Sequence, residues 1–339
     1  MKKLIIIICI LAAVSLASVG ITKVLNPQEA SKDDTFTIVT SFYPTYIATK
    51  NVANGIDGVE VVNLTENHSG CLHDYQLTTN DMRKLEGADV FVMNGGGMEE
   101  FIEDVVAKYP DLTVIDASTG IALLEPTKGH HHDHAEDMDD HAEDEHEHDH
   151  EEDLDDHEED EHDHEHEHEH EANAHVWMDP VRYMTQIENI TAGLKKADAG
   201  HTNEYEANQK TYLKKVEGIK EQLDALKDKQ HTSIITFHEA FSYLANYLGY
   251  DVVYCMDLDD ESGLSAGEIA EVIDEIQKHD VKVLFTETQY KDSVATNIST
   301  ETDAKTYVLT SLTAEEDDLD AYLNGMQKNI DVLKSVFAG

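Results

Sequence analysis

Short apolar runs rich in β-branched residues alternate along the chain with longer segments in which apolar residues recur at helical spacing. The first half contains four such runs, at residues 35–42, 59–65, 89–95 and 112–118. The intervening segments repeat their apolar positions every three or four residues, which is typical of helices that bury one face. Strands that alternate with helices in this way predict a mostly parallel sheet.

The second half of the chain repeats this order of elements. Its expected strands lie at residues 232–237, 250–256, 281–287 and 305–311. Ser265 and Glu268 have the spacing of a capping box, which predicts a helix start between the second and third of these strands. We therefore expect a second sheet of similar build.

The segment between the two halves is helical in pattern over residues 181–230. Within it, residues 203–229 contain no proline and only one glycine, Gly218, and are long enough for roughly seven helical turns. Apolar residues do not keep the heptad positions that a coiled-coil dimer requires, so we expect a monomer in which this helix is a stiff connector. The predicted fold is α/β, with two similar (βα)4-type lobes of mostly parallel sheets joined by a long rigid helix. The expected domains are an N-terminal lobe at 35–180, the connector at 181–230 and a C-terminal lobe at 231–339.

The first 25 residues have the pattern of an export signal. Two lysines precede a charge-free apolar run from Leu4 to Ile21. This run is long for a cleavable signal and barely long enough to span a bilayer, so a cleaved signal peptide and a retained membrane anchor both stay open. Either interpretation predicts an extracytoplasmic protein, at the cell surface or in the periplasm.

Charge narrows the class of partner. The 339 residues include 71 acidic and 24 basic ones, so we expect a cation as the partner and no nucleic acid. A tract from His130 to His170 holds 14 of the 21 histidines and 23 acidic residues, with almost no apolar ones, and we expect an insertion at 130–171 to be disordered. Its last alternating histidines are predicted to be weak auxiliary metal-binding sites: His162, His164, His166, His168 and His170.

Two cysteines lie outside the N-terminal apolar run, Cys71 and Cys255. An oxidising compartment favours a disulfide between them. Two buried thiols, or a thiolate on a metal, remain alternatives, because Cys71 is two residues from His73.

Three of the seven histidines outside the tract follow strands or lie in turn-rich segments. His73 is in SGCLHDYQLT, His175 opens HVWMDP, and His238 ends the strand-like ITFHEAF. Ligands of open α/β sheets bind at the carboxyl ends of the strands. We therefore expect His73 and His175 from the first lobe to meet His238 from the second across a cleft.

These motifs, taken in order, resemble one family. The segments FYPTY, LHDYQLTTNDMRKLEGADVFVMNGGGME, HVWMDP, ITFHEAFSYLANYLG and LFTETQY are similar to those of the zinc-specific solute-binding proteins of ABC metal importers, the ZnuA/AdcA type within the cluster A-I metal-binding lipoprotein and adhesin family. The likeness extends from about Thr37 to the C-terminus. It implies two lobes joined by a rigid helix, with one Zn²⁺ ion held between them and delivered to a membrane permease.

The resemblance also implies a ligand set. His73, His175 and His238 match the metal-binding histidines of the family, and three neutral imidazoles suit zinc better than manganese. The fourth ligand is predicted to be a water molecule, with Glu315 as the second choice. Glu287 matches a family glutamate and is predicted to accept a hydrogen bond from a ligating imidazole.

Other classes of function remain for comparison. Three histidines and a water also describe a zinc enzyme, but HEAFS has Ser242 where an H-E-x-x-H protease requires its second histidine. An extracellular zinc buffer or metallochaperone, in which the tract itself is the function, is the main alternative, and a manganese-binding homologue is a further one. We expect a non-enzymatic zinc-transport protein.

Overall fold

The computed structural model describes most of the predicted elements. The residues described are 35–65, 72, 75–99, 102, 105–106, 108–110, 112–127, 172–227, 230–256, 265–287, 298–314 and 317–337. The N-terminal apolar segment, the His-rich tract, Cys71, His73 and Glu315 lie outside these residues.

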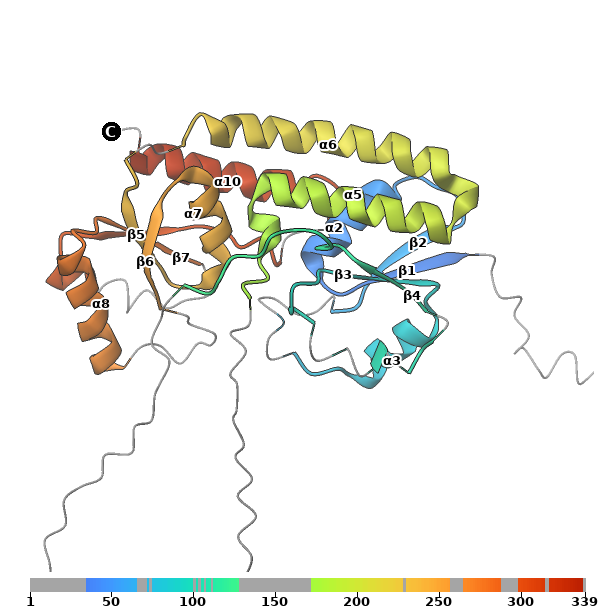
Figure 1. The fold of residues 1–339 in the computed structure, drawn as a ribbon, viewed down its shortest axis with the longest axis horizontal. Coiled ribbons are helices and arrows are strands. Elements are labelled where there is room, and N and C mark those ends of the chain that lie inside the picture. Colours follow the sequence, from blue (N-terminus) through green and yellow to red (C-terminus); the bar gives the residue numbers. More distant parts are fainter. Residues whose placement is uncertain are drawn as a thin grey trace, which may run out of the picture. The chain divides into compact units, whose positions relative to one another are not determined.

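Two four-stranded parallel sheets form the framework of the chain (Figure 1). The first sheet has the order β2-β1-β3-β4, with β1 at Phe36–Thr40, β2 at Val59–Asn63, β3 at Val90–Met93 and β4 at Thr113–Asp116. The second has the order β6-β5-β7-β8, with β5 at Ser233–Thr236, β6 at Asp251–Cys255, β7 at Val283–Thr286 and β8 at Lys305–Val308. Each of these strands falls inside a predicted run, and the two sheets have the same order, so the α/β prediction of two similar lobes is confirmed.

The chain divides into two compact units, one around each sheet. The first unit comprises Met1–Ile121, Pro180–Glu221 and Leu312–Gln327, and the second comprises Ala122–Asp179, Gln222–Ser311 and Lys328–Gly339. The described residues 122–127 and 172–179 thus belong to the second unit, whereas the sequence-based boundaries placed them in the N-terminal lobe. His175 lies in the second of these ranges.

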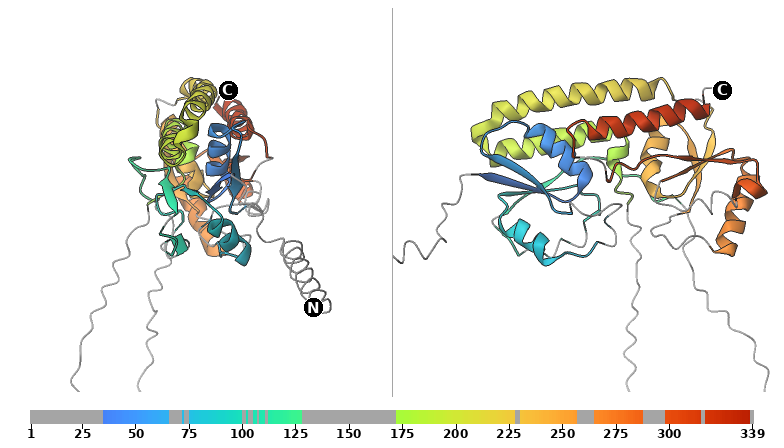
Figure 2. Two further views of the ribbon diagram at one scale, coloured as in Figure 1. Left: turned by 90° about the vertical axis from the view of Figure 1, so that its right-hand side faces the viewer. Right: turned by 180° about the vertical axis from the view of Figure 1, so that it is seen from behind.

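The first unit has helices on both faces of its sheet (Figure 2). Helix α3 (Thr79–Glu86) covers one face, and α2 (Tyr43–Val52) and α5 (Pro180–Ala197) cover the other. The core on the α3 side contains Val39, Leu64, Leu85, Phe91 and Ile102. Gly193 brings α5 close to the sheet, because a Cβ at this position would lie 2.5 Å from Cδ1 of Ile115.

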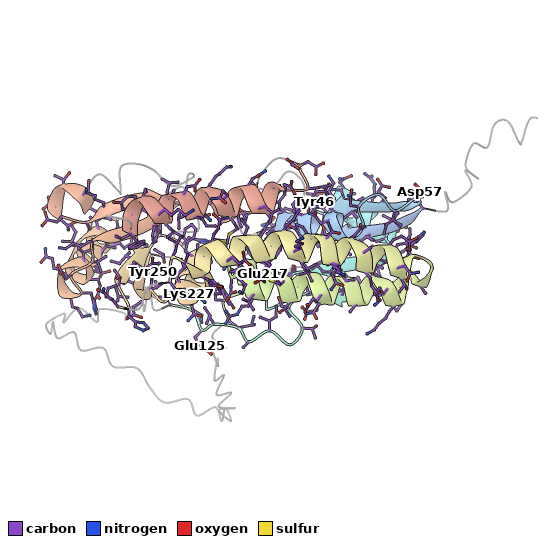
Figure 3. All side chains as sticks on the ribbon, turned by 90° about the horizontal axis from the view of Figure 1, so that it is seen from above. Tyr46, Asp57, Glu125, Glu217, Lys227 and Tyr250 are labelled. Atoms are coloured by element: carbon purple, nitrogen blue, oxygen red, sulfur yellow. The ribbon has the colours of Figure 1, made fainter. Side chains whose placement is uncertain are left out.

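The region 181–230 contains two helices. Helix α5 is followed by a short 3-10 turn at Ala199–His201 and then by α6 (Thr202–Asp224), and the two helices lie side by side (Figure 3). The Asp198 carboxylate accepts hydrogen bonds from the Tyr205 hydroxyl at 2.9 Å and from Nδ1 of His201 at 2.7 Å, which stabilises this turn. The long helix predicted at 203–229 is therefore α6, and the chain passes from the first unit to the second within it.

The second unit has α7 (Ser242–Leu248), α8 (Ala266–Lys278) and the end of α10 (Ala321–Phe337) around its sheet. The predicted capping box is present, since the Ser265 hydroxyl accepts from the Glu268 N–H and the Glu268 carboxylate accepts from the Ser265 N–H. A core cluster that includes Ile235, Phe237, Val272 and Leu284 packs α8 on the sheet. Across the described ranges, no helix combines enough length with enough apolar character to cross a bilayer.

Candidate metal centre

The segment that carries His175 is anchored in the second unit by packing. Val176, Trp177 and Met178 form one 3-10 turn, and all three side chains are fully buried. The Trp177 indole N–H donates to the Ser311 backbone oxygen at 2.8 Å. His175, next to this turn, is only 2% exposed, so its ring is held inside the unit rather than in solvent.

A buried asparagine contacts both the backbone N–H and the imidazole ring of His175. The side-chain oxygen of Asn173 accepts from the His175 backbone N–H at 3.0 Å and lies 2.9 Å from Nδ1 of the same residue. The Asn173 amide nitrogen donates to the Glu239 backbone oxygen at 3.0 Å. One side chain therefore connects His175 to the start of the next histidine-bearing segment.

His238 lies beside His175. It lies two residues after the end of β5, where its side chain faces the short 3-10 helix Glu239–Phe241, and it is 4% exposed. The two imidazole rings have centroids 5.0 Å apart and are nearly perpendicular. The chain thus brings two of its three predicted histidine ligands together.

Both of these histidines belong to the second unit. From the sequence, His175 was expected to come from the first lobe and to meet His238 across a cleft. The HVWMDP motif follows the first four strands in the sequence, but its turn packs against α7 of the second unit. The sheet on which such a segment packs is decided by contacts between residues 66 to 70 positions apart, and the sequence of the segment itself does not reveal that choice.

Glu287 lies at the end of β7, the strand next to β5 in the sheet. Its Oε2 atom is 3.5 Å from Nδ1 of His238, and its side chain is 3% exposed. The Ala240 backbone N–H also points at Nδ1 of His238, at 3.3 Å. A carboxylate at this place can accept a hydrogen bond from Nδ1–H of the imidazole when Nε2 binds a metal. Imidazoles that bind a metal usually have such a hydrogen-bond partner.

Other described histidines lie away from this pair. His201 binds Asp198 in the first unit, while His231 and His279 lie near the carboxylates of Asp251 and Glu275 at the surface. Within the described ranges, no group of three or more His, Cys, Asp or Glu side chains is assembled to hold a metal ion. The described part of the candidate centre therefore consists of the imidazoles of His175 and His238, with the Glu287 carboxylate next to His238.

A family model decides the class of the protein. The model described as "Zinc-uptake complex component A periplasmic", ZnuA, matches residues 38–336. The chain belongs to the ZnuA family. The resemblance drawn from the five motifs is confirmed, and it covers both sheets.

Two curated relatives illustrate the range of ZnuA-type proteins. The chain is 31% identical over 311 residues to the high-affinity zinc uptake system protein ZnuA of Bacillus subtilis (strain 168), covering 90% of this chain and 88% of that protein. It is 29% identical over 264 residues to the zinc-binding protein AdcA of Streptococcus pyogenes serotype M3 (strain ATCC BAA-595 / MGAS315), covering 77% of this chain and 47% of AdcA. The chain thus spans about half the length of this AdcA relative.

Solved structures share the ZnuA-type fold. The SBP FpvC of Pseudomonas aeruginosa in complex with Mn²⁺ is similar with a TM-score of 0.69 and 21% identity, covering 90% of this chain and 98% of FpvC. The Zn(II)-bound ZnuA-like domain of Streptococcus pneumoniae AdcA has a TM-score of 0.65 and 22% identity, covering 88% and 99%. At these identities the likeness concerns the fold, and two different metals occur on it.

Asn173 and Tyr243 were not found by sequence reasoning on this ZnuA-family chain. The Tyr243 hydroxyl donates to the Asn173 backbone oxygen at 2.6 Å and accepts from the Leu124 N–H at 2.9 Å. The only available signal was the position of Asn173 two residues before a candidate ligand, and a polar residue there is equally typical of a solvated loop.

Glu99 has a role that its sequence position did not reveal. Glu99 is 1% exposed and accepts from the backbone N–H groups of Asn94 at 2.6 Å and Gly95 at 3.0 Å. Burial raises the pKa of this carboxyl to about 7. Gly95 is required beside it, since a Cβ there would lie 2.0 Å from Oδ1 of Asp116. This network stands at the end of β3 in the first unit.

Proposed function

We propose that this chain is the extracytoplasmic zinc-binding component of an ATP-driven zinc uptake system, which captures Zn²⁺ and delivers it to the membrane permease of an ABC importer. The observation that carries the proposal is the buried pair His175 and His238, with ring centroids 5.0 Å apart. Membership of the ZnuA family and the zinc-binding names of the relatives support the same metal.

The complete ligand set follows from the family resemblance. His73 supplies the third imidazole, and a water molecule or Glu315 completes a tetrahedral site. Zinc accepts three nitrogen ligands and one oxygen readily, whereas manganese prefers oxygen ligands. Because related folds carry other metals, the selectivity of this chain depends on its ligands rather than on its fold.

The protein acts by binding, without catalysis. A metalloprotease of the H-E-x-x-H type is disfavoured because Ser242 occupies the second histidine position, and its hydroxyl lies 3.2 Å from the Thr127 hydroxyl. The partners are the zinc ion and the permease, the protein is a monomer, and nucleic acid is not a partner. The N-terminal segment either is removed after export or holds the protein at the membrane.

The main competing function is a zinc buffer in which the tract does the binding. The deciding experiment is calorimetric measurement of zinc stoichiometry and affinity on the full chain and on a variant that lacks residues 130–170. The proposal expects one tight site that survives the deletion, together with loss of several weak sites. Loss of all tight binding on deletion would favour the buffer, and turnover of esters or bicarbonate by the zinc-loaded protein would favour an enzyme.

A further inference from the structure

The hydrogen bonds around Asn173 define which way its side-chain amide points. One end faces the His175 backbone N–H, which can only donate, and the other faces the Glu239 backbone oxygen, which can only accept. Turning the amide over would set two donors against each other at one end and two acceptors at the other. The oxygen of Asn173 is therefore the atom next to His175.

An amide oxygen can only accept a hydrogen bond. Because it lies 2.9 Å from Nδ1 of His175, the proton of a neutral imidazole has to be on Nδ1. The lone pair is then on Nε2, and this is the tautomer that a metal ion bound through Nε2 requires. The His175 N–H and the Glu239 backbone oxygen orient the Asn173 amide, and the amide in turn selects the tautomer of the His175 ring.

Asn173 itself has little freedom to move. It is 3% exposed, its backbone N–H donates to the Leu124 oxygen at 2.9 Å, and its backbone oxygen accepts from the Tyr243 hydroxyl. Leu124 and Asn173 form an antiparallel bridge, and Tyr243 contacts both residues. The asparagine is thus fixed from its main chain as well as from its side chain.

His238 is held differently. Its Nδ1 lies 3.3 Å from the Ala240 nitrogen, a donor, and 3.5 Å from the Glu287 carboxylate, an acceptor. These two long contacts require opposite protonation of Nδ1, so they do not select one tautomer.

We propose that Asn173 is a positioning residue for zinc binding, which fixes the tautomer and orientation of His175 in the metal-free protein. This inference rests on the proposed function, because it assumes that His175 is a ligand. Removing such a partner of a ligating imidazole typically weakens metal binding by roughly tenfold to a hundredfold.

The first test is spectroscopic and uses the metal-free full chain labelled with ¹⁵N. Long-range ¹⁵N–¹H correlation spectra report which ring nitrogen carries the proton, and the signal missing from a His175→Gln variant belongs to His175. The inference expects the Nδ1–H tautomer in the wild type. A wild-type His175 with its proton on Nε2, or one that averages between both forms, would overturn it without recourse to any Asn173 variant.

The second test compares three substitutions by spectra, zinc competition titration and thermal unfolding. Asn173→Ala should release the tautomer and weaken zinc binding by roughly tenfold or more, whereas Asn173→Asp keeps the accepting oxygen and should keep the Nδ1–H form. Asn51→Ala is the matched control, because Asn51 is another buried asparagine, and its amide nitrogen donates to the Ile47 and Leu319 backbone oxygens in the first unit. It should lower stability and leave both the tautomer and the zinc affinity unchanged.

Different results would contradict the role of Asn173 and the role of His175. If His175→Gln leaves tight zinc binding intact, His175 is not a ligand, and both the inference and this part of the proposed function are wrong. If His175→Gln abolishes tight binding while Asn173→Ala retains the wild-type tautomer and affinity, the inference alone is wrong.

Discussion

The Glu287 carboxylate lies 3.5 Å from Nδ1 of His238, and both side chains are almost completely buried. A buried carboxylate in this place can orient the imidazole and increase its basicity when Nε2 binds zinc. Glu287→Gln should therefore weaken zinc binding by roughly tenfold to a hundredfold, as measured by competition titration on a protein that lacks residues 130–170.

A matched control for this substitution exists on α8. Glu275 lies 3.1 Å from Nε2 of His279 at the protein surface, so Glu275→Gln also removes a carboxylate from beside a histidine. It should leave zinc affinity unchanged. Equal losses in the two variants would show that the effect of Glu287 is not specific to the candidate centre.

His175 and His170 should behave oppositely on substitution. His175 is buried beside the packed Trp177, whereas His170 belongs to the alternating tract, in which neighbouring histidines can replace it. His175→Ala should lower the affinity of the tight site by orders of magnitude, and His170→Ala should leave it unchanged. Similar effects of the two substitutions, large or small, would contradict the boundary drawn at Ala174.

Zinc binding should also change the fluorescence of Trp177, the single tryptophan of the chain. Its ring centroid lies 5.1 Å from that of His175, so a metal ion on this imidazole alters the surroundings of the indole. The change should persist after deletion of residues 130–170 and should saturate at one equivalent of zinc. A signal that disappears with the tract would place the reported binding elsewhere.

Zinc should bind more tightly than manganese by orders of magnitude. The proposed ligands are imidazoles, which suit zinc, and no carboxylate ligand has been identified among the described residues. Competition titration on the tract-deleted protein measures the ratio of the two affinities. Displacement of zinc by a comparable concentration of manganese would show that His238 or the whole ligand set has been misassigned.

The stability of the first unit should depend on pH through Glu99. Its pKa is raised to about 7 in the folded chain from an ordinary value of 4.5, so between these values the native state binds more protons than the unfolded state. The free energy of unfolding should therefore fall as pH rises from about 4.5 to 7, by an amount on the order of 3 kcal/mol from this group. Denaturant unfolding of the metal-free, tract-deleted protein at several pH values measures this slope.

Glu99→Gln should flatten this dependence. The variant cannot ionise, although it should also be less stable at low pH, because its amide nitrogen cannot accept from Asn94 or Gly95 as a carboxyl oxygen does. An unchanged slope in the variant would assign the pH dependence to other groups.

Cys71 and Cys255 are still predicted to form a disulfide. Cys255 is fully buried at the end of β6, and Cys71 lies outside the described residues. Intact mass after alkylation of the denatured, unreduced protein should show neither thiol modified, and both should react once a reductant is added. Two alkylated thiols without reductant would refute the pairing.

The strands were predictable because their signal is local. Runs such as 232–237 and 281–287 are short, apolar and rich in β-branched residues, and β5 and β7 lie within them. The order of strands in each sheet and the position of the His175 segment depend on contacts between distant residues, which periodicity does not record. His238 was predictable as a strand-end residue. Asn173 was not, because its role comes from Glu239 and Tyr243, which are distant in sequence.

The two flanks of the His-rich insertion are fastened together on the second unit. Leu124 and Asn173 pair with each other, and the Thr127 N–H donates to the Glu239 carboxylate at 2.8 Å. Because these attachments precede and follow residues 128–171, we expect a change in the length of that span to cost little, since each doubling of loop length adds only about 0.6 kcal/mol. The fold therefore has a site between Thr127 and Asn173 at which a foreign domain or a longer His-rich segment can be inserted. The imidazoles of His175 and His238 should keep their geometry after such an insertion.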